Sequence, residues 1–204
     1  MKNIIVKSGK YNMINNTDIV LLNRRKGGII SSLNRFFTKF SLTHCALGIG
    51  KIRRINSVIT ADERVNIQPC ENYYVEKNTD IYVYKLKMDI DIKIINNIIT
   101  NIYTTLAGTK YDFTQTLFFI YRWFMETVFK KDVNKERNIF ISGKNRSICS
   151  ELVFIYLYEI SNCNIELRTF LDKHYTQNTV NVADIYKILN NFPTIFELVE
   201  KRNK

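Results

Sequence analysis

The chain has 204 residues, of which 46% are hydrophobic and 13% aromatic, and its formal net charge is +11. This length suits one domain with its own core, and the apolar content excludes an intrinsically disordered chain. No repeat, low-complexity tract or Pro/Gly/Ser-rich linker divides the sequence. We therefore expect a single domain over residues 1–204.

The positive charge is concentrated at the start of the chain. Residues 1–54 contain eleven Lys or Arg and one acid, Asp18, so this quarter carries +10 while the rest is nearly neutral. Such a segment is either a solvated face or a surface for an anionic partner. An anionic membrane fits it better than nucleic acid, because its basic residues are not interleaved with the exposed aromatic residues that bind single strands.

The cysteines argue against a metal centre or a disulfide framework. Cys45, Cys70, Cys149 and Cys163 are irregularly spaced, without a C-x-x-C pair, and only two histidines are present. Zinc sites need closely paired ligands, so we expect no metal, no cofactor and free thiols in a reducing compartment. The apolar run near the start is too short for a signal peptide or a membrane span, which predicts a cytoplasmic protein, peripheral to membranes at most.

Periodicity predicts mainly strands in the first half of the chain and helices in the second. The first half reads as a strand at 18–23, a basic loop at 24–28, a helix at 30–40, strands at 44–50 and 57–61 joined by a hairpin at 51–56, and strands at 65–67 and 81–86. The second half reads as helices at 89–106, 115–130, 147–161 and 182–189, with a cap at Gly108, a loop at 131–146 and a tail from Phe192.

The helix at 115–130 is strongly apolar apart from Arg122 and Glu126. It is too short to span a bilayer, and packing in the core is the ordinary interpretation. An aromatic helix beside a cationic surface is also the make-up of an interfacial membrane anchor.

One cysteine stands where a nucleophile could be activated. Ser147 is a candidate N-cap, which would place Cys149 in the first turn of a helix, where the helix dipole and free N–H groups favour a thiolate and an oxyanion. A base is also needed, and His44, at the start of an apolar strand, is better fixed than His174, in a polar stretch typical of a surface loop. By spacing alone, a single cysteine on a helix stripe, such as Cys149, is more often a packing residue than a nucleophile.

Four sequence blocks add a family resemblance. Residues 17–22 (TDIVLL), 42–49 (LTHCALGI), 108–113 (GTKYDF) and 148–153 (ICSELV) occur in this order. Together they resemble the permuted papain-like hydrolases of the NlpC type, in particular the YiiX-like group, which has a poxvirus branch. The resemblance covers residues 17–70 and 108–160. It implies an α+β, circularly permuted papain-like fold, with a small antiparallel sheet or partial barrel packed against helices.

The resemblance also implies the roles of individual residues. Cys149 would be the nucleophile and His44 the general base, and Tyr111 would line the substrate pocket or the oxyanion side, unless it is simply a packing tyrosine. Family members usually carry a Glu that orients the His, and Thr60 stands at that position here. Glu63 lies close in sequence as an alternative carboxylate. A Thr can orient an imidazole, but it cannot stabilise the cation as a carboxylate does.

The expected activity is cleavage of an amide or a (thio)ester of a peptide or lipid through an acyl-enzyme. The related lecithin retinol acyltransferase group has a similar arrangement and acts on lipids, and the basic first quarter suits a lipid substrate. The alternative is a protein that keeps the fold but is catalytically impaired by the missing Glu, and that acts at an anionic membrane or partner. The oligomeric state stays open.

Overall fold

The computed structural model describes residues 14–24, 32, 35, 41–76, 78–112, 114–131 and 146–202. The helix predicted at 30–40, the basic loop after Arg24 and most of the loop at 131–146 lie outside these residues.

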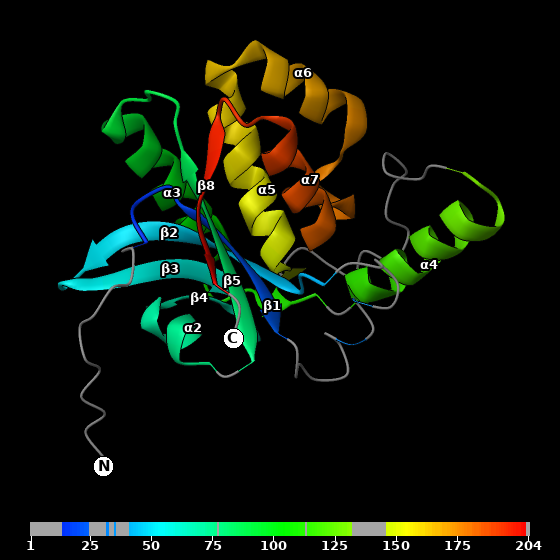
Figure 1. The fold of residues 1–204 in the computed structure, drawn as a ribbon, viewed down its shortest axis with the longest axis horizontal. Helices are drawn as coiled ribbons and strands as arrows, with labels where there is room; N and C mark the ends of the chain where they lie inside the picture. The colour runs from blue at the N-terminus through cyan, green and yellow to red at the C-terminus, as the bar shows by residue number, and fades with distance from the viewer. Residues whose placement is uncertain are drawn as a thin grey trace.

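A six-stranded antiparallel sheet forms the centre of the molecule, in the order β4-β3-β2-β1-β5-β8 (Figure 1). Its strands are β1 (Ile19–Arg24), β2 (His44–Ile52), β3 (Ile55–Ala61), β4 (Val65–Pro69), β5 (Thr79–Leu86) and β8 (Phe196–Arg202). The strands predicted in the first half are confirmed. The prediction of a tail from Phe192 is wrong, because residues Phe196–Arg202 pair with β5 and form the edge strand β8.

Six helices accompany the sheet within the described residues. They are α2 (Glu71–Val75), α3 (Ile92–Leu106), α4 (Thr114–Val128), α5 (Cys149–Ile160), α6 (Ile165–His174) and α7 (Val182–Asn191). The helices α3, α4, α5 and α7 were predicted, and Gly108 follows α3 with a φ of +75°, as expected of a residue that ends a helix. The hydrophobic pattern of the sequence does not predict α2 or α6.

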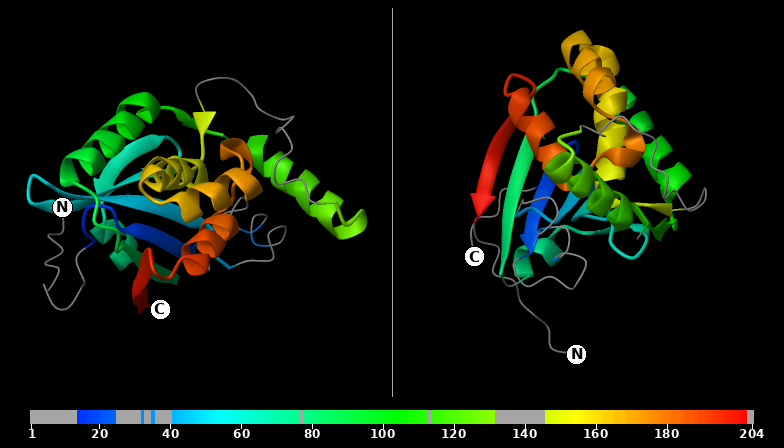
Figure 2. Two further views of the ribbon diagram at one scale, coloured as in Figure 1. Left: turned by 90° about the horizontal axis from the view of Figure 1, so that it is seen from above. Right: turned by 90° about the vertical axis from the view of Figure 1, so that its right-hand side faces the viewer.

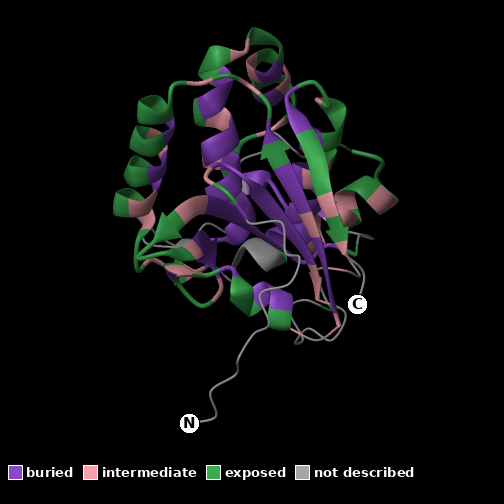
Figure 3. Ribbon diagram, turned by 60° about the vertical axis from the view of Figure 1, so that its left-hand side comes forward, coloured by how far each residue is buried: buried purple, intermediate pink, exposed green. Residues whose placement is uncertain are grey.

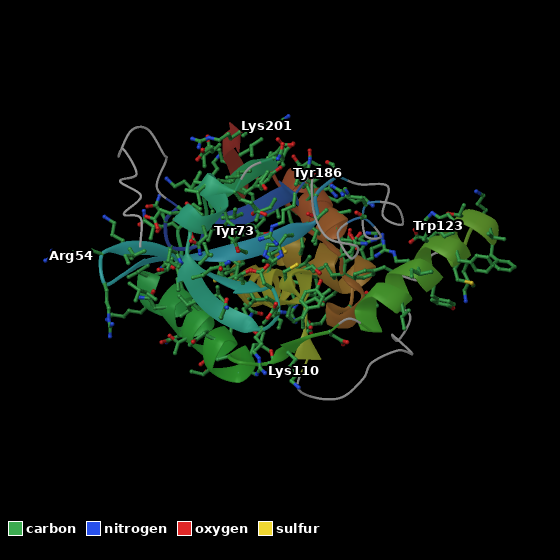
Figure 4. All side chains as sticks on the ribbon, turned by 90° about the horizontal axis from the view of Figure 1, so that it is seen from below. Arg54, Tyr73, Lys110, Trp123, Tyr186 and Lys201 are labelled. Carbon is green, nitrogen blue, oxygen red and sulfur yellow. The ribbon has the colours of Figure 1, made fainter. Side chains whose placement is uncertain are left out.

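The helices lie in layers. Figures 1 and 2 show α3, α5, α6 and α7 on one side of the sheet, α2 on the other, and α4 projecting from the body of the molecule. Arg54, in the β2–β3 turn, and Trp123, on α4, mark opposite ends of the long axis (Figure 4). The α+β class with an antiparallel sheet packed against helices is thus confirmed.

Strand β1 is buried on both faces, because its side chains alternate between two cores (Figure 3). Ile19 and Leu21 belong to the large core beneath α3, α5 and α7. Val20 and Leu22 belong to a second core, which includes the two buried tyrosines of α2. The predicted short buried strand is therefore the central element between two layers.

Gly48 in β2 is required by a close approach of the backbone. The amide of Gly48 donates to the carbonyl of Asp18 at 2.7 Å, and its carbonyl accepts from the amide of Thr17 at 2.9 Å. A Cβ at this position would lie 2.3 Å from the carbonyl oxygen of Asn15. Any side chain would displace the segment that leads into β1.

The projecting helix α4 is attached to the body by a buried ion pair. Arg122 donates to both carboxylate oxygens of Asp184, at 2.7 and 3.2 Å, and to the carbonyl of Thr179 at 3.3 Å. Asp184 also closes the capping box of α7 with Asn181. Burial acts to lower the pKa of Arg122, but the charge and hydrogen bonds of Asp184 outweigh it and raise the pKa. The pair holds α4 against the first turn of α7.

The two apolar faces of α4 have different surroundings. Phe118 and Phe119 are buried and form a small cluster with Ile148, whereas Leu117, Phe124 and Val128 are exposed. Core packing thus accounts for one face of the helix and leaves the other unexplained. Among the described residues, no helix is both long enough and apolar enough to cross a membrane.

Arg122 offers a matched stability test, because it also pairs with the exposed Glu126 at 2.8 Å. We expect Arg122→Met to lower the free energy of unfolding by about 3–5 kcal/mol, since it leaves the Asp184 carboxylate buried without its guanidinium. Glu126→Ala removes only a surface i,i+4 pair and should cost about 0.5 kcal/mol or less. Urea denaturation followed by circular dichroism measures both. Equal, small losses would contradict the role of the buried pair.

Candidate functional site

Cys149 is the first residue of α5 and packs against the start of β2. Its side chain is 3% exposed, and Ile148, in extended conformation, is the N-cap. The prediction of Ser147 as N-cap is wrong, because Ser147 lies in the short strand β7 (Arg146–Ser147), one residue before the cap Ile148, whose side chain makes no capping hydrogen bond. The backbone amides of the first turn point toward the cysteine end of the helix.

The surroundings of Cys149 favour its thiolate. A hydrogen bond from the thiol of Cys45 lowers the pKa of Cys149 most, and burial opposes it. The charge of His44, its hydrogen bond to the sulfur and the backbone amide of Cys45 lower the pKa further. The net pKa lies well below the ordinary value of a cysteine. The helix dipole acts in the same direction.

His44 is the first residue of β2, where it pairs with Leu22 of β1 and is 4% exposed. Its Nε2 lies 2.6 Å from Oγ1 of Thr60, on the neighbouring strand β3. Because Nε2 is occupied in this way, Nδ1 is the ring nitrogen that remains for Cys149. His44 thus contacts Thr60 directly, and its charge acts on Cys149. The prediction that His174 lies in a surface loop is wrong, because His174 is the exposed last residue of α6.

A carboxylate that the sequence analysis did not consider also faces the imidazole. Oδ1 of Asp62 lies 3.6 Å from Nε2 of His44. The other candidate, Glu63, has an exposed side chain, and its backbone carbonyl accepts a hydrogen bond from the amide of Tyr111. Both residues lie in the bend that follows β3, which turns the side chain of Asp62 toward the imidazole and leaves that of Glu63 exposed.

Asp62 is itself held by two donors. Arg24 donates to Oδ1 at 3.1 Å, and Gln68 donates to Oδ2 at 3.2 Å. Burial acts to raise the pKa of Asp62, but the charges of His44 and Arg24 and the two hydrogen bonds outweigh it, so that the pKa is lowered. The carboxylate is therefore ionised at neutral pH and can stabilise an imidazolium.

Tyr73 of α2 closes the other side of the imidazole. Its hydroxyl lies 3.4 Å from Nε2 of His44 and accepts a hydrogen bond from Gln68 at 2.8 Å. The two rings meet edge to face, with their centroids 6.1 Å apart. Figure 4 shows Tyr73 near the middle of the molecule, against the sheet. The short helix α2, absent from the sequence prediction, thus belongs to the surroundings of the base.

Tyr111 reaches the site through the short strand β6 (Lys110–Tyr111). This strand pairs in parallel with β7, and Tyr111 lies opposite Ser147, two residues before the nucleophile. Burial and the nearby thiol groups of Cys149 and Cys45 raise the pKa of Tyr111 well above its usual value. The structure therefore brings all four residues selected from the sequence into one region.

A small pocket opens beside Cys149. The first turn of α7 contributes Asn181 to its wall, and Thr43 and Ser150 supply further polar groups. The rest of the wall is apolar and is formed by Leu42, Tyr111, Phe119, Ile148, Val182 and Ala183. A bound group at this position would meet mostly hydrophobic side chains next to the sulfur.

Comparison with known proteins identifies the fold. No family model matches the chain, and no curated protein matches it significantly. Among solved structures, the chain is similar to the crystal structure of metalloprotein YiiX from Escherichia coli O157:H7 (DUF1105), with a TM-score of 0.52 and 12% identity. The match covers 94% of this chain and 97% of that one. The YiiX-like fold predicted from the sequence blocks is thereby confirmed.

The description of YiiX as a metalloprotein raises the question of a metal centre in this chain. Across the part of the chain that the structure describes, no three His, Cys, Asp or Glu side chains converge in a way that could hold a metal ion. The side chains at the site therefore do not fit a metal centre.

The position of Asp62 gives a test with a neighbouring control. We expect Asp62→Asn to slow alkylation of Cys149 by iodoacetamide at pH 7 by about three- to tenfold, because the imidazolium that accompanies the thiolate loses its carboxylate. Glu63→Gln removes the charge of the next, exposed residue and should change the rate less than about twofold. Peptide mass spectrometry gives the rate at Cys149. Equal rates in the two variants would exclude Asp62 from the site.

Proposed function

We propose that the chain is a cysteine hydrolase that cleaves an amide or (thio)ester bond through an acyl-enzyme, with Cys149 as nucleophile and His44 as base. The observation that carries the proposal is the placement of Cys149 at the start of α5, where the charge of His44 acts on it, while the imidazole contacts Thr60 and faces Asp62. Activation of a helix-start thiol by an oriented imidazole is the arrangement that nucleophilic catalysis by cysteine requires.

The reaction follows from this arrangement. The Cys149 thiolate attacks the carbonyl carbon, and the negative charge that develops on the carbonyl oxygen meets the backbone amides at the start of α5. As the carbon–nitrogen or carbon–oxygen bond breaks, the His44 imidazolium gives its proton to the leaving amine or alcohol. A water molecule then attacks the acyl-enzyme while His44 takes its proton, and the carbon–sulfur bond breaks to release the acid and restore the thiolate.

Two residues share the orienting role that a single Glu has in the YiiX-like group. The hydroxyl of Thr60 is the short-range partner of Nε2 and fixes the plane of the ring. Asp62, farther away and 32% exposed, supplies the negative charge that Thr60 lacks. Because a charge faces the imidazole, the missing Glu is no longer a reason to expect an impaired enzyme.

The surfaces around the site favour an acyl substrate with an apolar chain, from a lipid ester or a lipid amide, over a polar peptide. The pocket beside Cys149 is lined mainly by hydrophobic side chains, although its volume of about 10 Å³ is too small for a whole acyl chain. Nearby, α4 exposes Leu117, Phe124 and Val128, and Lys130 and Lys131 follow it. Exposed apolar side chains beside lysines suit attachment to an anionic lipid surface.

Trapping of the acyl-enzyme tests the proposal. Incubation with p-nitrophenyl esters of short and medium fatty acids should add one acyl group to Cys149 and release nitrophenol in a burst. His44→Ala should abolish the burst, because the thiolate loses its partner. His174→Ala, at the exposed end of α6, is the matched control and should retain it.

The set of cysteines that become acylated distinguishes the hydrolase from a binding protein with the same fold. Acylation spread over Cys45, Cys70, Cys149 and Cys163, unchanged in His44→Ala, would show that Cys149 is not activated. The chain would then be a binding protein that retains the fold without its chemistry.

A further inference from the structure

A second cysteine lies directly beneath the proposed nucleophile. Cys45 follows His44 in β2, and because side chains alternate along a strand, it points to the face that α5 covers. Cys45 is fully buried, and Cys149 of α5 belongs to the same core. The two thiols therefore come from the two elements whose contact forms the site.

The other two cysteines lie elsewhere in the fold. Cys70 precedes α2 and belongs to the core on the opposite face of the sheet. Cys163 lies in the turn Ser161–Cys163, after the far end of α5, and is exposed. Only Cys45 and Cys149 are thus placed to react with each other within one chain.

Leu42 and Thr43, just before His44 and Cys45 in the chain, line the same small pocket as Cys149, and Cys45 faces the helix that Cys149 begins. Burial and the neighbouring Cys149 raise the pKa of Cys45 well above its ordinary value, while that of Cys149 is lowered. All four cysteines are free in this structure. A disulfide between the two would require the sulfurs to approach to about 2.05 Å.

The chemistry of such a pair differs from that of an isolated nucleophile. A low-pKa thiolate is the form of cysteine that hydroperoxides oxidise, and without a neighbouring thiol the oxidation proceeds to sulfinic acid, which is not readily reversed. A thiol in contact with the oxidised sulfur can intercept it as a disulfide, which dithiols reduce.

We propose that Cys45 is a resolving thiol for Cys149, so that oxidation by a hydroperoxide closes a reversible Cys45–Cys149 disulfide that switches the nucleophile off and protects it. The inference rests on the proposed function to the extent that it takes Cys149 as a reactive thiolate. It adds a redox-modification site formed by a residue that makes and breaks no bond in the hydrolysis.

The steps balance with the hydroperoxide as oxidant. The Cys149 thiolate attacks the terminal peroxide oxygen, the O–O bond breaks, and an S–OH group forms, while the leaving alkoxide takes the proton of the His44 imidazolium. The Cys45 sulfur then attacks the Cys149 sulfur, the S–O bond breaks, and hydroxide leaves with the Cys45 proton as water. Two thiols and one hydroperoxide give one disulfide, one alcohol and one water.

Oxidation of the full chain with a small excess of hydrogen peroxide tests the proposal. Digestion under non-reducing conditions should yield a cross-linked pair of peptides that contain Cys45 and Cys149, with the loss of two hydrogens. Alkylation of Cys149 should fall as the cross-link forms and should recover almost fully after treatment with dithiothreitol.

Variants at two buried cysteines provide the comparison. In Cys45→Ala, the same treatment should oxidise Cys149 to sulfinic acid, and dithiothreitol should restore little of its alkylation. Cys70→Ala changes a buried cysteine of the other core and should behave as the unaltered chain. If Cys45→Ala does not fold, the cross-link in the unaltered chain still decides the question.

The outcomes separate this proposal from the proposed function. Sulfinic acid at Cys149 without a cross-link to Cys45, in a chain whose reduced form alkylates rapidly at Cys149, overturns the resolving role and leaves the hydrolase intact. Slow alkylation of Cys149 in the reduced chain, no faster than at Cys70, overturns both.

Discussion

The site depends on one packing contact, that of the first turn of α5 on the first residues of β2. This contact places Cys149 at a helix start, His44 beside it and Cys45 beneath it. The helix contributes its dipole and backbone amides, and the strand contributes a base whose position is set by the hydrogen bonds of the sheet. The remaining elements either support this contact or bound the pocket next to it. A change in the angle between α5 and the sheet would separate all three side chains at once.

The sheet also explains how the base is oriented without the expected Glu. Thr60, on β3, and Asp62, in the bend just after the strand, both face Nε2 of His44, at 2.6 and 3.6 Å. One gives a short neutral hydrogen bond and the other a charge at longer range, which Arg24 keeps ionised. The functions of hydrogen bonding and charge stabilisation, combined in a single carboxylate elsewhere, are here divided between two residues. Asp62 can be partly exposed to solvent without loosening the imidazole, because the buried hydrogen bond to the ring is made by Thr60.

Much of the fold could be predicted from the sequence, because β1 to β5 and α3 to α5 show strong hydrophobic periodicity. The edge strand β8 could not, since it is mostly exposed and is defined by pairing with β5, more than a hundred residues earlier in the chain. Asp62 lies in the bend after β3, where the two-residue period of the strand no longer applies, so the sequence pattern could not favour Asp62 over Glu63. Tyr73 could not be predicted either, because it comes from α2, a five-residue helix without a helical pattern of its own. The contact between Cys45 and Cys149 depends on which face α5 covers, and no local pattern gives that.

The central claim is that Cys149 is a thiolate at neutral pH because of its contacts with His44 and Cys45. The pH dependence of its alkylation by iodoacetamide, followed from pH 4 to pH 10 by peptide mass spectrometry, tests this most directly. The account predicts a rate that is already near its plateau well below about pH 8.5, the ordinary value for cysteine, and that loses this low-pH component in His44→Ala. A rate that rises only around the ordinary cysteine pKa, equally in both proteins, would contradict it.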